Sequence, residues 1–152
     1  MKKLFLLLLP FFISGCSWIN GFYIVNVSDS EMVVRYRPKK MQNNGVFQMH
    51  PVRHTCVYEN GKLKMDEVDG DHLSAADSSD VILCVLQQNE ALFIGETMNM
   101  KMDDPDQRKK ACENLREISI VNEKGTETIS ATGMFAANLF VNIDGNMVML
   151  LK

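Results

Sequence analysis

The amino-acid sequence predicts a mainly β domain, an antiparallel β-sandwich or barrel-like fold with one short helix. Short runs of β-branched and aromatic residues recur along the chain. Turn residues separate these runs roughly every 8 to 12 residues, which is typical of all-β sandwiches and barrels. Strands do not alternate regularly with long amphipathic helices, and this argues against a parallel sheet.

The amino-terminal half contains the first predicted strands. Residues 22–27 and 31–37 are rich in β-branched and aromatic side chains, and the polar link between them predicts a hairpin. Residues 46–49 and 55–59 lie on either side of Pro51. Because proline cannot donate a hydrogen bond to a neighbouring strand, we expect this stretch at the edge of a sheet.

The middle of the chain contains a turn, a loop and an apolar run. Asn60-Gly61 predicts a tight hairpin turn into a strand at 62–65. Residues 66–80 are polar and predict one long surface loop. Residues 81–86 are six consecutive apolar residues, which predicts a central strand covered on both faces. The chain then turns and runs back as a strand at 91–100.

One helix is predicted after Asp104. This aspartate can cap the helix, Pro105 occupies the first helical position, and Gln107 completes a pattern resembling a capping box. The pattern is short, so we expect one to three turns. The remaining predicted strands are 115–121, 126–132, 140–143 and 147–151, the last two forming a hairpin, while 134–139 fits either a helical turn or a strand.

Composition limits the class of protein. The chain has 152 residues, of which 46% are hydrophobic and 23% are charged. These values are typical of a globular domain and exclude a disordered chain, a collagen and a coiled coil. The net charge of −3 provides no basic field that would hold nucleic acid. We expect a single β-rich domain at 22–152.

The amino-terminal residues predict an export signal. Lys2 and Lys3 precede a continuous apolar stretch at 4–13. Ten residues of helix span ~15 Å, half of the ~30 Å hydrocarbon core of a bilayer. Residues 1–15 are therefore predicted to be a signal peptide and not a membrane-spanning helix.

The end of this segment resembles a known processing site. Ile13-Ser14-Gly15-Cys16 resembles the lipobox of bacterial lipoproteins, with Ile13 in place of the usual leucine. The resemblance implies that Cys16 receives a diacylglyceryl group on its thiol and becomes the first mature residue. Residues 16–21 would then be a lipidated tether. Ser17, which is not aspartate, implies passage to the outer membrane if the source is Gram-negative.

These features predict an envelope lipoprotein anchored in the lipid bilayer through acylated Cys16. Removing Lys2 and Lys3 from the sixteen basic residues leaves fourteen, against nineteen acidic residues. A mildly acidic domain gains nothing from an anionic membrane surface, so the lipid must provide the anchoring. We expect a non-catalytic binding module without a cofactor, whose partner is another envelope protein, a peptide or a glycan.

Three cysteines remain after Cys16, namely Cys56, Cys84 and Cys112. An odd number in an oxidising compartment predicts one disulfide and one free thiol, with the pairing left open. No two cysteines have the C-x-x-C spacing, so a thioredoxin-like redox role has no support in the sequence.

The alternative function comes from methionine. Met98, Met100 and Met102 alternate strictly, and an extended strand would place all three thioethers on one face. Thioethers select Cu(I), so this stripe suggests a periplasmic copper carrier. Methionine also packs adaptably in cores. We expect the three side chains to be mostly buried, or divided by a strand end near Lys101, and to form no metal site.

No catalytic constellation is found in the sequence. His50 and His54 lie on either side of Pro51, which prevents a helical metal-binding pair. The acidic residues within 66–71 lack the spacing of a calcium loop. Neither a nucleophile–base pair nor a glycine-rich phosphate loop can be assembled, so we do not expect an enzyme.

Overall fold

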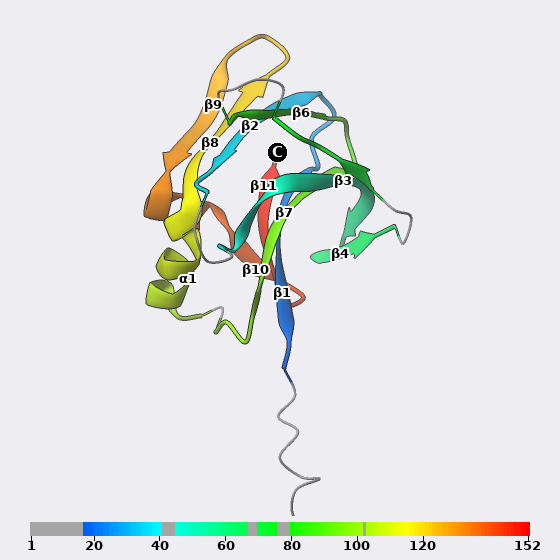
Figure 1. Ribbon diagram of the computed structural model, residues 1–152. Coiled ribbons are helices and arrows are strands. Elements are labelled where there is room, and N and C mark those ends of the chain that lie inside the picture. Colours follow the sequence, from blue (N-terminus) through cyan, green and yellow to red (C-terminus); the bar gives the residue numbers. More distant parts are fainter. Residues whose placement is uncertain (1–16, 41–44, 67–69, 76–79, 102) are drawn as a thin grey trace, which may run out of the picture.

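The computed structural model describes residues 17–40, 45–66, 70–75, 80–101 and 103–152. Two β-sheets pack against each other, and a short α-helix lies at one end of the molecule (Figure 1). The prediction of a mainly β sandwich or barrel-like fold with one short helix is confirmed.

The larger sheet, sheet A, has seven strands and curls into a half-barrel. Its order is β10-β11-β1-β7-β3-β4, with β5 paired to β3. The strands are β1 (Ile19–Asn26), β3 (Phe47–Glu59), β4 (Lys62–Met65), β5 (Asp71–His72), β7 (Glu90–Met98), β10 (Val141–Ile143) and β11 (Asn146–Leu151). The pair β1–β11 is parallel and the other pairs are antiparallel.

The smaller sheet, sheet B, has the order β6-β2-β8-β9, and all its pairs are antiparallel. Its strands are β2 (Met32–Pro38), β6 (Ile82–Leu86), β8 (Leu115–Asn122) and β9 (Glu127–Thr132). In the described residues, one α-helix, α1 (Pro105–Ala111), and two single 3-10 segments, η2 (Cys112–Asn114) and η3 (Gly133–Leu139), lie outside the sheets. They pack against one another beside the start of β8.

The main core lies between the two sheets. Phe22, at its centre, packs edge-on against Phe47 and Phe140, with ring centroids 5.0 and 5.4 Å apart. A smaller cluster, which includes Val25 and Val148, fills the curl on the other face of sheet A. Because strand side chains alternate between faces, β1 supplies residues to both clusters and is buried along most of its length.

Buried polar side chains connect the two sheets. The hydroxyl of Tyr36 on β2 lies 2.9 Å from the carbonyl oxygen of Gln48 and 3.2 Å from that of Ile94, both in sheet A. Tyr36 has no exposed surface, and burial raises the pKa of its hydroxyl far above the ordinary value. The neutral hydroxyl therefore donates to sheet A across the core.

Several predicted local structures are confirmed. Asp104 caps α1 by accepting from the backbone N–H groups of Asp106 and Gln107, and Pro105 starts the helix. The Asn60-Gly61 turn connects β3 and β4, and both residues take positive φ angles. The hairpins β8–β9 and β10–β11 also form as predicted, and η3 is the helical alternative for 134–139.

The predicted hairpin between 22–27 and 31–37 is wrong. The corresponding strands, β1 and β2, belong to different sheets. Buried Asn26 organises the crossing, because its side chain donates to the carbonyl oxygens of Ser30 and Leu86 and accepts from Ser28. A polar turn signal predicts a change of direction but does not say which sheet the next strand joins.

The expectation that the Pro51 stretch forms a sheet edge is also wrong. β3 is one continuous strand between β7 and its partners β4 and β5. Its pairing with β7 is interrupted between Phe47 and Val52. Pro51 lies in this interruption, so its missing N–H costs no ladder hydrogen bond there.

The predicted central strand at 81–86 is an edge strand. β6 lies at the end of sheet B, with Ile82, Cys84 and Leu86 buried while Leu83 and Val85 are 55% and 39% exposed. Six apolar residues in succession therefore do not require two covered faces. The outward pair leaves apolar side chains on the surface of sheet B.

Two boundaries differ from those predicted. β1 begins at Ile19, inside the segment 16–21 expected to be a tether. The predicted loop at 66–80 contains the short strand β5, whereas 67–69 and 76–79 lie outside the described residues. The folded domain therefore begins only three residues after Cys16.

Candidate functional site

The predicted methionine stripe does not form one surface in the described residues. Met98 ends β7 and is 66% exposed, whereas Met100 is 5% exposed. Asn99 between them has φ of 54°, which breaks the strand alternation. Met102 lies outside the described residues. Met98 and Met100 therefore lie in different environments and do not present their thioethers on one common surface.

The three cysteines after Cys16 lie on separate elements, Cys56 on β3, Cys84 on β6 and Cys112 on η2. All three are buried and free, so the structure pairs none of them in the expected disulfide. Burial raises the pKa of the Cys56 and Cys84 thiols to about 11 and that of Cys112 to about 12. The protonated thiols are weak nucleophiles at neutral pH.

The remaining candidate ligands are dispersed. His50 and His72 are exposed and His54 is half-buried. Within the described residues, no three histidine, cysteine or acidic side chains gather closely enough to hold a metal ion. Of the helices in the described part of the chain, none has the length and apolar character needed to cross a membrane. Cys16, the predicted lipidation site, lies outside the described residues.

Two hollows lie at the end of the molecule where β1 begins and β7 ends, and Met100 borders both. The first, of about 420 Å³, is lined by Gly45, Val46, Thr97, Met98, Asn99, Met100, Gln107, Lys110, Ala111, Glu113 and Asn114. The second, of about 590 Å³, is lined by Trp18, Asn20, Met100, Lys101, Asp103, Asp104 and Gly145. This end of the domain is therefore one candidate contact surface.

Buried Asn20 fixes the wall shared by the two hollows. Its side-chain oxygen accepts from the backbone N–H of Met100 at 3.2 Å, and its amide donates to the carbonyl oxygen of Gly145 at 2.8 Å. The segment after β7 and the β10–β11 turn are thereby held to β1. Asn20 is 2% exposed, so its hydrogen bond with Met100 is protected from water.

The helical side of the hollows is also hydrogen-bonded. The side-chain oxygen of Gln107 accepts from the backbone N–H of Lys101 at 2.9 Å, and its amide donates to the Asp104 carboxylate. Hydrogen bonds from the Gln107 and Asp106 backbone lower the pKa of Asp104. This carboxylate is therefore ionised, and its oxygens already accept hydrogen bonds from the first turn of α1.

Three exposed apolar side chains lie where β1 begins and β7 ends, and of these only Trp18 lines the second hollow. Trp18, Ile19 and Met98 are 51%, 58% and 66% exposed, and Ile19 lies opposite Met98 in the β1–β7 ladder. We call these three residues the Trp18 patch. Sequence reasoning missed it because residues 16–21 were assigned to a tether. The signal that could have indicated it is the position of the chain's single tryptophan, two residues after Cys16.

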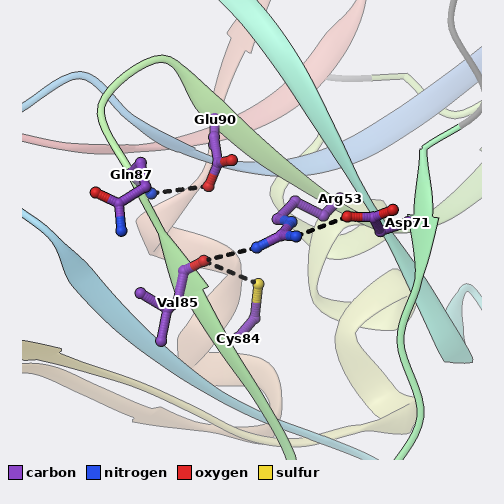
Figure 2. Close-up of polar contacts among 6 residues, drawn as sticks. All are labelled: Arg53, Asp71, Cys84, Val85, Gln87 and Glu90. Carbon is purple, nitrogen blue, oxygen red and sulfur yellow. Dashed lines mark hydrogen bonds and ion pairs between the residues drawn. The ribbon is translucent and has the colours of Figure 1, made fainter.

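A second surface cluster lies where the two sheets meet. Arg53 on β3 forms an ion pair of 2.6 Å with Asp71 on β5, and its other terminal nitrogen lies 3.5 Å from the carbonyl oxygen of Val85 on β6 (Figure 2). The hydrogen bond with Asp71 raises the pKa of the guanidinium. These contacts link β3 and β5 of sheet A to β6 of sheet B.

Comparison of the chain with models of known families, with curated proteins and with solved structures finds no match.

Proposed function

We propose that the protein is a lipoprotein of the bacterial cell envelope, anchored through acylated Cys16, whose β domain is a non-catalytic binding module. The observation that carries the proposal is the lipobox-like run Ile13-Ser14-Gly15-Cys16 placed directly before a folded domain. An extended chain spans at most ~3.6 Å per residue, so Ile19 lies within about 11 Å of Cys16. A lipid on Cys16 would hold the domain against the membrane surface.

The partner that we favour is another envelope protein or a peptide. Leu83 and Val85 are exposed on the edge strand β6, which lies at the opposite end of the molecule from the start of β1 (Figure 1). An apolar edge strand supports recognition of a polypeptide, because partner strands and apolar side chains can add to it. A domain anchored at residue 16 would present this edge away from the membrane.

Substitution of the acceptor cysteine tests the anchor. Cys16→Ser should abolish incorporation of labelled palmitate and leave uncleaved precursor in cells. The control Ser17→Ala changes the neighbouring residue and should be acylated and processed normally. If the Cys16→Ser chain is cleaved and partitions into detergent like the wild type, the lipoprotein proposal is wrong.

Site-specific crosslinking tests the binding module. A photoreactive amino acid at position 83 should give a discrete crosslinked species in intact cells. The same group at Asn138, an exposed residue of η3, is the control and should give none. Identical crosslinking patterns at the two positions would contradict a partner on β6.

A further inference from the structure

We propose that the Trp18 patch inserts into the interfacial region of the bilayer and forms a second contact between the domain and the membrane. The inference rests on the proposed lipid anchor and adds to it a surface of the folded domain. The occupant is therefore the lipid surface that carries the Cys16 acyl chains.

The geometry of the patch supports this contact. Ile19 and Met98 come from adjacent strands and lie directly opposite each other, so their side chains form one apolar surface. The backbone of Trp18 continues the ladder, because its N–H donates to Asn99 Oδ1 at 3.1 Å and its carbonyl accepts from Asn99 N–H at 2.9 Å. The Trp18 side chain lines the second hollow with Asn20 and Met100, so the exposed side chains flank the start of β1 on both of its faces, and about half of Trp18 is exposed.

Tryptophan has the chemistry that this position requires. The Trp18 indole N–H points toward the carbonyl oxygen of Met100 at 3.4 Å, which leaves the apolar body of the ring exposed. Aromatic rings with one polar atom concentrate at the boundary between lipid headgroups and acyl chains.

The distance to the anchor leaves the patch little freedom. Trp18 is two residues from Cys16, so at most ~7 Å of chain separates it from the acylated residue. Ile19 and Met98 then lie on the part of the domain nearest to the lipid. Exposed apolar side chains held at this distance gain free energy by leaving water for the interface.

The charges near the patch indicate an apolar contact and not an electrostatic one. The exposed basic residues at this end, Lys101, Lys109 and Lys110, are accompanied by exposed Asp103, Asp106, Glu113 and Asp144. The neighbourhood therefore has no excess of basic residues to attract anionic headgroups. We expect the contact to be insensitive to salt, because screening weakens charge interactions and leaves apolar burial largely unchanged.

Fluorescence of the single tryptophan tests the inference in the whole mature protein. The acylated chain is reconstituted in phosphatidylethanolamine–phosphatidylglycerol vesicles, with and without bromine on the acyl chains. Brominated lipid should quench most of the Trp18 emission, and aqueous acrylamide should quench little of it. Addition of salt should not restore the emission.

A double variant tests whether Trp18 is quenched because the patch inserts into the bilayer or only because Trp18 is close to the lipid anchor. Ile19→Ser with Met98→Ser changes two exposed side chains and should markedly reduce quenching by brominated lipid. The matched control, Leu83→Ser with Val85→Ser, changes two exposed apolar residues of β6 and should quench like the wild type. Thermal melts of both variants establish that the domain remains folded.

The outcomes distinguish this inference from the proposed function. Absence of an acyl group on Cys16 by mass spectrometry, with no flotation on vesicles, would overturn both proposals. Normal acylation and flotation with Trp18 unquenched by brominated lipid would overturn the patch alone. Equal quenching in the wild type and the Ile19→Ser/Met98→Ser variant would also overturn it, because the tether alone would then place Trp18 near the lipid.

Discussion

Asn114 and Phe47 exchange two hydrogen bonds although they are 67 residues apart in the chain. The Phe47 N–H donates to Asn114 Oδ1 at 3.1 Å, and Asn114 Nδ2 donates to the Phe47 carbonyl oxygen at 2.8 Å. The side-chain amide thus acts as a strand partner for the first residue of β3. Both residues are buried, so the contact fixes η2 to sheet A in the absence of water.

Removing this amide should destabilise the domain. Asn114→Ala would leave a buried N–H and a buried C=O of Phe47 without partners, at a cost of about 2–4 kcal/mol in the free energy of unfolding. Asn138→Ala, an exposed position on η3, is the control and should change stability little. Urea denaturation measures both variants, and equal midpoints would show that the Phe47 contact contributes nothing.

Strand β6 allows a matched comparison of two leucines. Leu86 has no exposed surface, so Leu86→Asp would bury an unpaired charge and should destabilise the domain by about 4 kcal/mol or more. Leu83 is 55% exposed on the same strand, so Leu83→Asp should shift the melting temperature by only about 2–3 °C. Unfolding of the Leu83→Asp variant would restore the interpretation of β6 as a strand covered on both faces.

Loss of the hydrogen bond that Tyr36 makes across the core should destabilise the domain less than Leu86→Asp does. Tyr36→Phe removes the hydroxyl that donates to sheet A and leaves a buried carbonyl oxygen without it, at a cost of about 1–2 kcal/mol. Tyr58→Phe, at a half-buried tyrosine packed against the smaller core cluster, is the comparison and should cost less. Guanidinium denaturation of the two variants measures the difference, and a larger loss for Tyr58→Phe would contradict the assignment.

The buried thiols predict a loss of stability at alkaline pH. Burial raises the pKa of Cys112 from 9.0 to about 12, so the unfolded chain releases this proton at lower pH than the folded chain. The stabilising contribution is complete below pH 9 and decreases as the pH rises toward 12. Cys112→Ala should weaken the pH dependence of unfolding in this range. An unchanged dependence would show that the thiol ionises equally in both states.

Thiol counting tests the pairing directly. Cys56, Cys84 and Cys112 should all react with a thiol reagent in the denatured, unreduced domain, because the structure leaves all three free. In the native domain at neutral pH they should react slowly, since they are buried and protonated. A count of one would restore the disulfide expected from the sequence.

The fold class and the local turns were predictable because their signals are local. The Asp104 cap and the Asn60-Gly61 turn depend on backbone geometry within a few residues, and both form as predicted. The assignment of strands to sheets was not predictable in the same way. Whether β1 pairs with β2 depends on side chains such as Asn26, whose partners include Leu86, 60 residues away.

The candidate site illustrates the same limit. The spacing of Met98 and Met100 predicts a shared face only if the chain between them is extended. Asn99 has a positive φ, so the chain is not extended there. The Trp18 patch requires residues from β1 and β7, about 80 positions apart, whose proximity follows from sheet pairing. Local patterns in the sequence carried no information about that pairing.

The parallel pairing of β1 and β11 has a consequence for how the chain is made. Gly21 and Asn146 are 125 residues apart, yet they are joined by a hydrogen bond beside this pair. A ribosome therefore releases β1 long before β11 is made, and the β1–β11 pair of sheet A cannot form until β11 has emerged. Such non-local closure is slow. A nascent chain in which sheet A has not closed can still pass through a translocation channel in an unfolded state. Premature termination before β11 would leave one edge of β1 unpaired and able to aggregate.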